Sequence, residues 1–152
     1  MIIWGRISWN GVGLLIEVQG KIDAVQYCEI LEEGVEESIK SLEMANYRWY
    51  FQQDNDSKHI SKKAERWFSD NNTIPMKWSA QSPDLNPIEH LWQHLKAKLQ
   101  QYDTSPKGVH ELWDRVAKEW TEILLETCQK LIESMPRKIQ AVLEAKGGYT
   151  KY

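Results

Sequence analysis

The sequence has little cysteine and no long apolar run, and each absence excludes a class of protein. Its two cysteines, Cys28 and Cys128, stand far apart, without a Cys-x-x-Cys pair or a Cys/His cluster. They predict buried thiols in a reducing compartment, so neither a zinc site nor a disulfide framework is expected. No stretch approaches the roughly 20 apolar residues of a membrane span, and the first residues lack a secretory pattern. A membrane partner is therefore not expected.

The chain also lacks a strong charge of one sign, since its net charge is −3 at pH 7. The whole-molecule charge therefore does not indicate a nucleic-acid-binding protein. Basic side chains nevertheless gather at Lys58, Lys62, Lys63 and Arg66. Such a group is typical of a solvated helix face, and it also suits contacts with DNA phosphates. Both interpretations stay open on composition alone.

Aromatic residues, by contrast, are abundant. Eight tryptophans occur in 152 residues, and 41% of the residues are hydrophobic. This composition favours a packed core over disorder, and the length suits one domain spanning residues 1–152. Periodicity and turn residues predict an α/β order that begins with a hairpin turning at Asn10 and Gly11. The expected strands cover 2–9, 13–19, 48–53 and 74–78. The expected helices cover 24–43 (capped by Asp23), 58–71 and a segment that begins at Pro87. Another long helix is expected to begin at Ser105 and to end at Pro136, followed by a last helix to Ala145.

Two carboxylates stand where such an order can bring distant residues together. Asp54 follows the expected strand 48–53, and Glu89 lies in the first turn of the helix that begins at Pro87. The segment between them, positions 55 to 88, is 34 residues long. Hard divalent cations prefer oxygen ligands, and two such ions can activate water and stabilise the leaving oxygen in phosphodiester cleavage. The layout therefore suits a metal site at one edge of a sheet.

Ordinary structural roles compete with this interpretation. An Asp after a strand is commonly a turn or cap residue. Glu89 stands three positions after Asn86, where a capping box would place it. His59, at the start of the next expected helix, is a typical surface residue. The residues alone leave these alternatives open.

Residues 51–59 (FQQDNDSKH) and 81–92 (QSPDLNPIEHLW) resemble the signature regions of the mariner-superfamily transposases, especially the branch that includes Sleeping Beauty. Residues 134–138 and 145–152 resemble the C-terminus of that branch, so the resemblance covers essentially the whole chain. Ser57 stands where the family usually has proline. The family uses an Asp–Asp–Glu triad with 34 residues between the second Asp and the Glu, and Asp54 and Glu89 match these two positions.

The resemblance implies fold, cofactor and partners. We expect a ribonuclease H-like mixed sheet flanked by helices, with extra C-terminal helices. Asp54 and Glu89 would be the catalytic, metal-binding residues for Mg2+ or Mn2+. The implied partners are transposon-end and target DNA, a second copy or a full-length transposase, and the implied location is the nucleus. Candidate DNA contacts are Lys58, His59, Lys62 and Lys63.

Two features of the family have no match in this sequence. The first catalytic Asp lies on the family's first, central strand; here Asp23 is expected at a helix cap and Glu17 on the outer hairpin strand. The helix-turn-helix modules that recognise transposon ends are also not matched. We therefore expect a gap, open or filled by a partner, between residues 2–9 and 48–53. The leading interpretation is a transposase catalytic-domain fragment, and the alternative is an inactive, transposase-derived remnant that binds DNA or a partner transposase.

Overall fold

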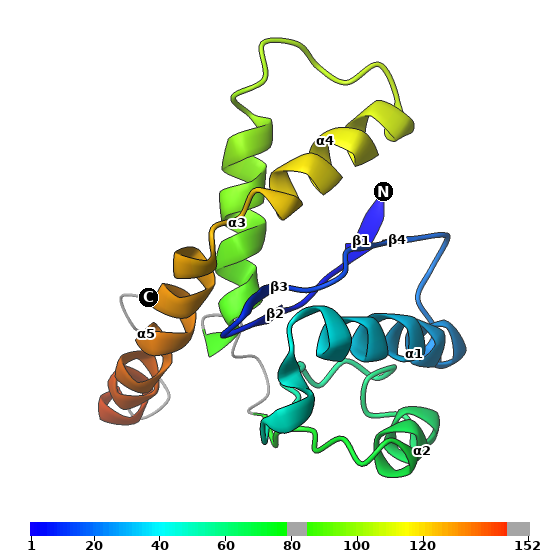
Figure 1. Ribbon diagram of the computed structural model, residues 1–152, viewed down its shortest axis with the longest axis vertical. Helices are drawn as coiled ribbons and strands as arrows, with labels where there is room; N and C mark the ends of the chain where they lie inside the picture. Colours follow the sequence, from blue (N-terminus) through cyan, green and yellow to red (C-terminus); the bar gives the residue numbers. More distant parts are fainter. Residues whose placement is uncertain (79–84, 146–152) are drawn as a thin grey trace.

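The computed structural model describes residues 1–78 and 85–145 of the chain (Figure 1). A long, bent β-hairpin runs between two groups of helices, with α1 and α2 on one side and α3, α4 and α5 on the other. None of the helices in the described ranges is long and apolar enough to cross a membrane. The elements are β1 (Ile2–Trp4), β2 (Ile7–Ser8), β3 (Gly11–Val12), β4 (Ile16–Val18), α1 (Ala24–Ser41), the 3-10 turn η1 (Met44–Asn46), α2 (Lys62–Asp70), α3 (Pro87–Leu99), α4 (Val109–Thr121) and α5 (Leu125–Glu144).

The predicted hairpin is confirmed, but its turn lies one residue earlier than expected. Ser8 pairs with Gly11, so the turn residues are Trp9 and Asn10, and Gly11 begins the returning strand. Gly11 has a φ of 121°, a conformation that strongly favours glycine, and this places it directly after the turn. The sequence pattern therefore located the turn correctly to within one residue, but it assigned the two turn positions to Asn10 and Gly11.

The hairpin is interrupted near its middle, at Arg6. β1 pairs with β4 and β2 with β3, both antiparallel, while Gly13 N donates to Arg6 O (2.8 Å) between the two pairs. The Arg6 guanidinium turns to α1, where it donates to the carbonyl oxygens of Gly34 and Val35. Burial lowers the pKa of Arg6 to about 10, so the side chain still carries its charge at neutral pH. The single expected strand over 2–9 is thus two short ones.

The strands expected over 48–53 and 74–78 are reduced to one parallel bridge between Phe51 and Pro75. Phe51 N donates to Ile74 O (2.8 Å), and Met76 N donates to Phe51 O (2.7 Å). These expectations of full strands were wrong, because local sequence indicates an extended segment but not the length over which a partner pairs with it. Within the described residues, Phe51 has this one bridge partner. The expected loop over 79–86 lies mostly outside the described residues.

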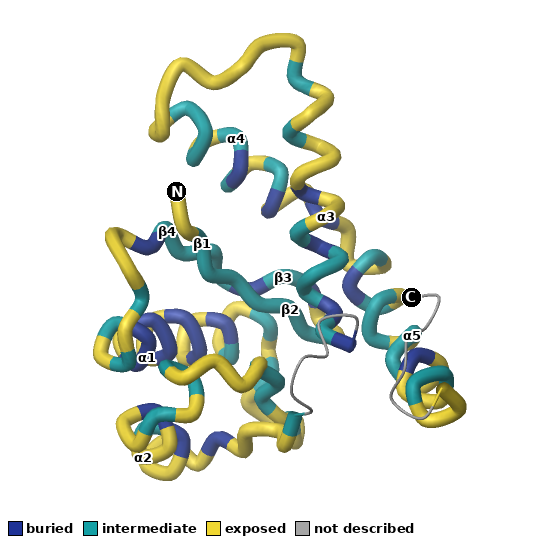
Figure 2. The backbone as a smooth tube through the Cα atoms, turned by 180° about the vertical axis from the view of Figure 1, so that it is seen from behind, coloured by how far each residue is buried: buried dark blue, intermediate teal, exposed yellow. Residues whose placement is uncertain are grey.

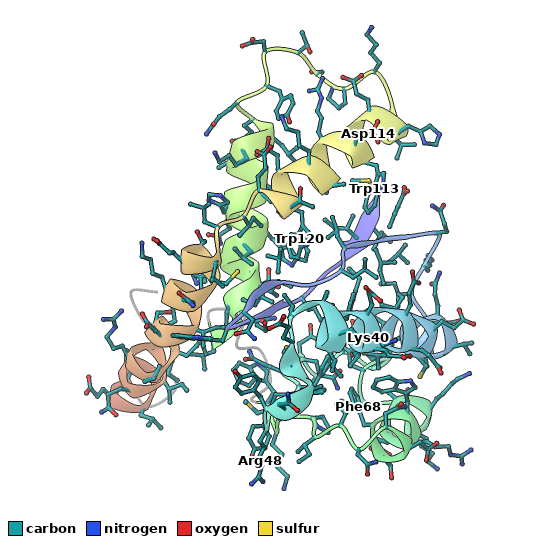
Figure 3. The ribbon with its side chains drawn as sticks, in the orientation of Figure 1. Lys40, Arg48, Phe68, Trp113, Asp114 and Trp120 are labelled. Atoms are coloured by element: carbon teal, nitrogen blue, oxygen red, sulfur yellow. The ribbon has the colours of Figure 1, made fainter. Side chains whose placement is uncertain are left out.

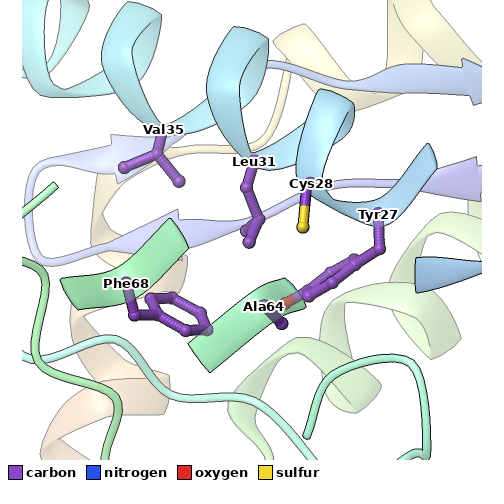
Figure 4. Packing of buried hydrophobic residues seen from close by; sticks show 6 residues of the cluster. All are labelled: Tyr27, Cys28, Leu31, Val35, Ala64 and Phe68. Carbon is purple, nitrogen blue, oxygen red and sulfur yellow. The ribbon is translucent and has the colours of Figure 1, made fainter. Parts of the chain in front are cut away.

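Hydrophobic side chains form two clusters, one on each side of the hairpin. The first joins α1 to α2, and Figure 4 shows its buried members. Trp4, Trp49 and Phe51 pack against its edge. The second joins α3, α4 and α5, and Ile3, Ile7 and Val12 of the hairpin pack against it. Adjacent residues of a strand face opposite ways, which is why Ile3 and Trp4 contribute to different clusters.

The C-terminal helices depart from the predicted boundaries. The connection after α3 is exposed along most of its length, and α4 begins at Val109 rather than at Ser105 (Figure 2). The helical structure is interrupted between Thr121, where α4 ends, and Leu125, where α5 begins, whereas Pro136 lies inside α5. The prediction that Pro136 ends the helix was wrong. Proline removes only one helical donor, and buried residues before and after it, Cys128 and Lys138, hold α5 in place.

A cavity of about 780 Å3 lies between residues 3–10 of the hairpin and residues 47–54. Among the described residues, the hairpin strands pair with one another and Phe51 pairs with Pro75. The prediction that 2–9 and 48–53 do not pair directly is therefore confirmed for this part of the chain. The position of the cavity matters for function, because its lining also includes Asp54 and Glu89.

Candidate metal centre

Asp54 occupies the first position of a tight loop that leads from the Phe51 bridge to α2. Its Oδ1 atom accepts a hydrogen bond from Asp56 N (3.1 Å), and Asp56 Oδ1 in turn accepts one from Lys58 N (3.1 Å). These consecutive aspartate turns fold the loop back on itself. Asn55 fastens the loop to the neighbouring segment, since its Nδ2 donates to Trp78 O (3.0 Å). The Asp54 side chain remains 61% exposed, so a cation from solvent can reach it.

Glu89 stands in the first turn of α3. Pro87 occupies the start of the helix and is buried, and Glu89 N donates to Asn86 O (3.1 Å). The expected cap position of Asn86 is confirmed, but its side chain makes no capping hydrogen bond. Among residues 1–78 and 85–145, the Glu89 carboxylate makes no capping-box hydrogen bond either. Glu89 instead lines the cavity with Asp54 and Asn86.

The structure thus brings the two predicted carboxylates to one cavity from separate elements. Oxygen donors of this kind suit Mg2+ or Mn2+, and both residues belong to the lining of the same cavity. Across residues 1–78 and 85–145, no group of three His, Cys, Asp or Glu side chains is placed to hold a metal ion. The described lining supplies two carboxylates.

His59 lies beside Asp54 rather than free on the surface. Its Nδ1 is 2.5 Å from Asp54 Oδ1, and its ring lies against Tyr27 of α1 with 4.3 Å between the centroids. Tyr27 donates its hydroxyl hydrogen to Gln53 Oε1. The sequence analysis singled out neither Tyr27 nor Gln53 as a functional residue. Helical spacing gave no signal of their link to His59.

The predicted basic residues divide into two kinds. Lys58 pairs with Asp56 (Nζ to Oδ2, 2.5 Å), and this pair is the main reason why the pKa of the Asp56 carboxyl is lowered. Lys62, Lys63 and Arg66 are exposed on α2, whose opposite face buries Ala64 and Phe68. The three exposed side chains remain available for phosphate contacts, and their role stays a prediction.

A third feature that sequence reasoning missed is a buried lysine next to the candidate centre. Lys138 of α5 is 4% exposed, and its Nζ lies 2.5 Å from Nε2 of His90, the residue after Glu89. The contact ties α5 to the first turn of α3. A Lys in the middle of a helix that contains a proline carries no pattern that would indicate this pairing.

The described fold defines a mixed α/β domain of the kind found in transposase catalytic domains. The catalytic domain of the Mos1 mariner transposase matches it with a TM-score of 0.84 at 17% identity, covering 98% of this chain and 75% of that one. The Mos1 paired-end complex with Mn matches with a TM-score of 0.87 at 16% identity, covering 98% of this chain and 44% of that one. At such identities the likeness establishes the fold, which is ribonuclease H-like.

Sequence relatives identify the family. The model of the DDE superfamily endonucleases matches residues 3–113. The Tcb1 transposase of Caenorhabditis briggsae is 37% identical over 154 residues, and the Tc1 transposase of Caenorhabditis elegans is 36% identical over 152 residues. Each alignment covers 100% of this chain and 54% of the relative, so the chain spans about half the length of these transposases. The chain belongs to the DDE endonuclease superfamily, as a Tc1/mariner-family transposase catalytic domain, which confirms the predicted family.

Proposed function

We propose that this chain supplies part of the metal-dependent catalytic centre of a DNA transposase, with Asp54 and Glu89 as the cation ligands. The observation that carries the proposal is that both carboxylates line one cavity, although they lie on different elements. Their oxygen atoms fit Mg2+ or Mn2+. When bound, such ions polarise a phosphodiester and lower the pKa of an attacking water. Asp54 and Glu89 would hold them, and no covalent protein–DNA intermediate is required.

The cavity also supports a finer proposal about the fold. It lies between the hairpin and residues 47–54, where the first strand of a ribonuclease H-like sheet would be expected. Its lining includes residues of both segments, among them the apolar residues Ile3, Trp4 and Phe51. An extended segment could pair with both edges there and add a third carboxylate. A second copy or a full-length transposase is a candidate source of such a segment.

DNA is the proposed substrate and partner. Mos1 has been solved as a paired-end complex with its left transposon end and as a strand transfer complex. By analogy, transposon-end and target DNA would approach Asp54 and Glu89, with Lys62 and Lys63 on the nearby α2 as phosphate contacts. A role on chromosomal DNA implies a nuclear location. The parent activity would be cleavage of transposon ends and joining of the freed 3′ hydroxyl to target DNA.

A second candidate function is that of an inactive, transposase-derived protein that binds DNA or a partner transposase. The observation in its favour is that the described cavity presents two carboxylates and no group of three metal-ligating side chains. Cation binding alone would not separate the two functions, since either could keep a weak site. Cleavage of a transposon-end duplex separates them when the chain is supplied with a segment that fills the cavity and adds a third carboxylate, because only the leading proposal then expects products.

Manganese relaxation of amide NMR signals tests the cation site directly, because paramagnetic broadening detects weak binding and locates it. We expect Mn2+ to broaden the signals of residues around Asp54 and Glu89 first. Asp54→Asn and Glu89→Gln should each abolish this selectivity. Asp114→Asn, which removes an exposed carboxylate on α4 (Figure 3), is the matched control and should leave it intact. Uniform broadening in all four proteins would contradict the proposed site.

A further inference from the structure

The Asp54 carboxylate is exposed, yet one of its two oxygen atoms is fixed. Oδ1 accepts hydrogen bonds from Asp56 N (3.1 Å) and interacts with His59 Nδ1 (2.5 Å). A carboxylate oxygen accepts, so in this contact the His59 Nδ1 carries the hydrogen. Both contacts fall on the same oxygen. The orientation of the carboxylate is thereby set, and the hydrogen bonds among residues 1–78 and 85–145 leave Oδ2 available to a ligand.

His59 is itself held much more firmly than the residue it contacts. Its side chain is 15% exposed, against 61% for Asp54. The imidazole lies against the Tyr27 ring with an interplanar angle of 39°. Tyr27 is 1% exposed and belongs to the cluster between α1 and α2 (Figure 4). The position of the imidazole is therefore fixed by the hydrophobic core and not by the loop alone.

A second connection runs from Tyr27 to the backbone of His59. The Tyr27 hydroxyl donates to Gln53 Oε1, and Gln53 Nε2 donates to His59 O (3.1 Å). Burial, with a smaller contribution from Asp54, raises the pKa of Tyr27, so the hydroxyl keeps the proton that it donates. Tyr27 thus fixes His59 twice, through its ring and through Gln53. The chain of contacts ends at Asp54 Oδ1.

We propose that His59 is a positioning residue, which holds the Asp54 carboxylate ready for a cation, and that Tyr27 and Gln53 support it. This inference rests on the proposed cation site and assigns His59 a role other than the DNA contact expected from the sequence. Groups that orient metal-binding carboxylates through hydrogen bonds strengthen metal binding without touching the ion. The supporting residues come from α1 and from the segment before the loop, so the core sets the geometry of an exposed ligand.

Mn2+ titrations of the whole chain test the role of His59. His59→Ala should weaken binding at Asp54 by about 10-fold or more, the usual cost of losing such a supporting hydrogen bond. His59→Asn should restore most of the affinity, because its amide nitrogen takes the place of Nδ1 as a donor. Tyr27→Phe keeps the ring but removes the hydroxyl, and should give an intermediate loss. His110→Ala, which removes an exposed imidazole on α4, should change nothing.

A measurement without metal separates this inference from the proposed function. Nitrogen-15 spectra of the imidazole should show His59 with its hydrogen on Nδ1, and Asp54→Asn should shift that signal. If His59 carries its hydrogen on Nε2 alone, or if His59→Ala binds Mn2+ as tightly as the wild type, the positioning role is refuted. If the wild type shows this tautomer but no Mn2+ binding near Asp54, the contact stands while the cation site fails. The positioning role then fails with it.

Discussion

Gly13 has almost no room for a side chain, and we expect Gly13→Ala to destabilise the fold substantially. A β-carbon at this position would lie 2.5 Å from Ser38 Oγ and 2.9 Å from Arg6 Nε. Ser38 is 1% exposed, and its hydroxyl accepts from Leu14 N (3.1 Å) and donates to Gly34 O (3.1 Å). The added methyl group would displace a hydroxyl that joins the hairpin to α1.

Three contributions set the size of the effect. Forcing extra volume into a packed site costs about 1–3 kcal/mol. Displacing the Ser38 hydroxyl from its two partners adds about 1 kcal/mol for each hydrogen bond lost. Alanine also restricts the unfolded chain, which returns about 0.4–1 kcal/mol, because Gly13 does not have the positive φ that would strain alanine. We expect a net loss of about 2–4.5 kcal/mol, a large share of the ~5–15 kcal/mol of a typical domain.

Urea unfolding followed by tryptophan fluorescence measures this loss. The midpoint should fall while the slope stays constant, which indicates a change in stability alone. Gly108→Ala is the control, since nothing lies within 4 Å of a β-carbon at that position and its backbone is extended. A loss below about 1 kcal/mol is expected there, from a weaker N-cap.

A double variant tests the cause. Ser38→Ala removes the atom in closest conflict, so the combined loss in Gly13→Ala with Ser38→Ala should be smaller than the sum of the two single losses. Strict additivity, or a Gly13→Ala protein as stable as the wild type, would refute the steric explanation. The Arg6 side chain would still crowd the methyl group, so full recovery is not expected.

Four further predictions follow from other contacts. The pKa of Asp23 is lowered by hydrogen bonds from Gln26 N and, to a smaller extent, from Val25 N. The stability that Asp23 contributes is therefore present at neutral pH and is lost as the pH falls below about 4. Asp23→Asn should flatten the pH dependence of the unfolding free energy in that range. Lys138→Ala should cost about 1–3 kcal/mol in the same unfolding assay because it removes a buried side chain and its contact with His90, and an unchanged midpoint would exclude this role. The chain alone should not cleave a transposon-end duplex with Mn2+, and products that Glu89→Gln abolishes would show that it does. Binding to duplex DNA should be weak, insensitive to sequence and steeply dependent on salt, with a shallower salt slope after Lys62→Ala and Lys63→Ala.

Local signals predicted the parts of the fold that depend on nearby residues. The helix over 24–43 was expected from apolar spacing and the Asp23 cap, and α1 covers Ala24–Ser41 with that cap in place. The strand over 48–53 depended on partners elsewhere in the chain, which local spacing does not specify. The end of α4 was missed for a related reason. The chain turns where Ile123, which is 8% exposed, packs into the second cluster, and the more visible Pro136 is tolerated inside α5.

The candidate site shows the same division. The family spacing of Asp54 and Glu89 was visible in the sequence, and both line one cavity. The contact of His59 with Tyr27 joins residues on different elements through tertiary packing, so no spacing rule indicates it. The contact between Lys138 and His90 arises likewise from the docking of α5 against α3. Sequence patterns identify residues that meet a ligand more readily than those that support them.

The two hydrophobic clusters have a consequence for how the domain opens. Each cluster buries its own helices, and the hairpin is the element that contributes side chains to both. Segments with separate cores commonly exchange their amide hydrogens as separate cooperative units. Amides of α1 and those of α4 should therefore exchange with different opening free energies. A strand bound in the cavity would contact the hairpin and residues 47–54 together. It should therefore make the opening free energies of α1 and α4 more alike.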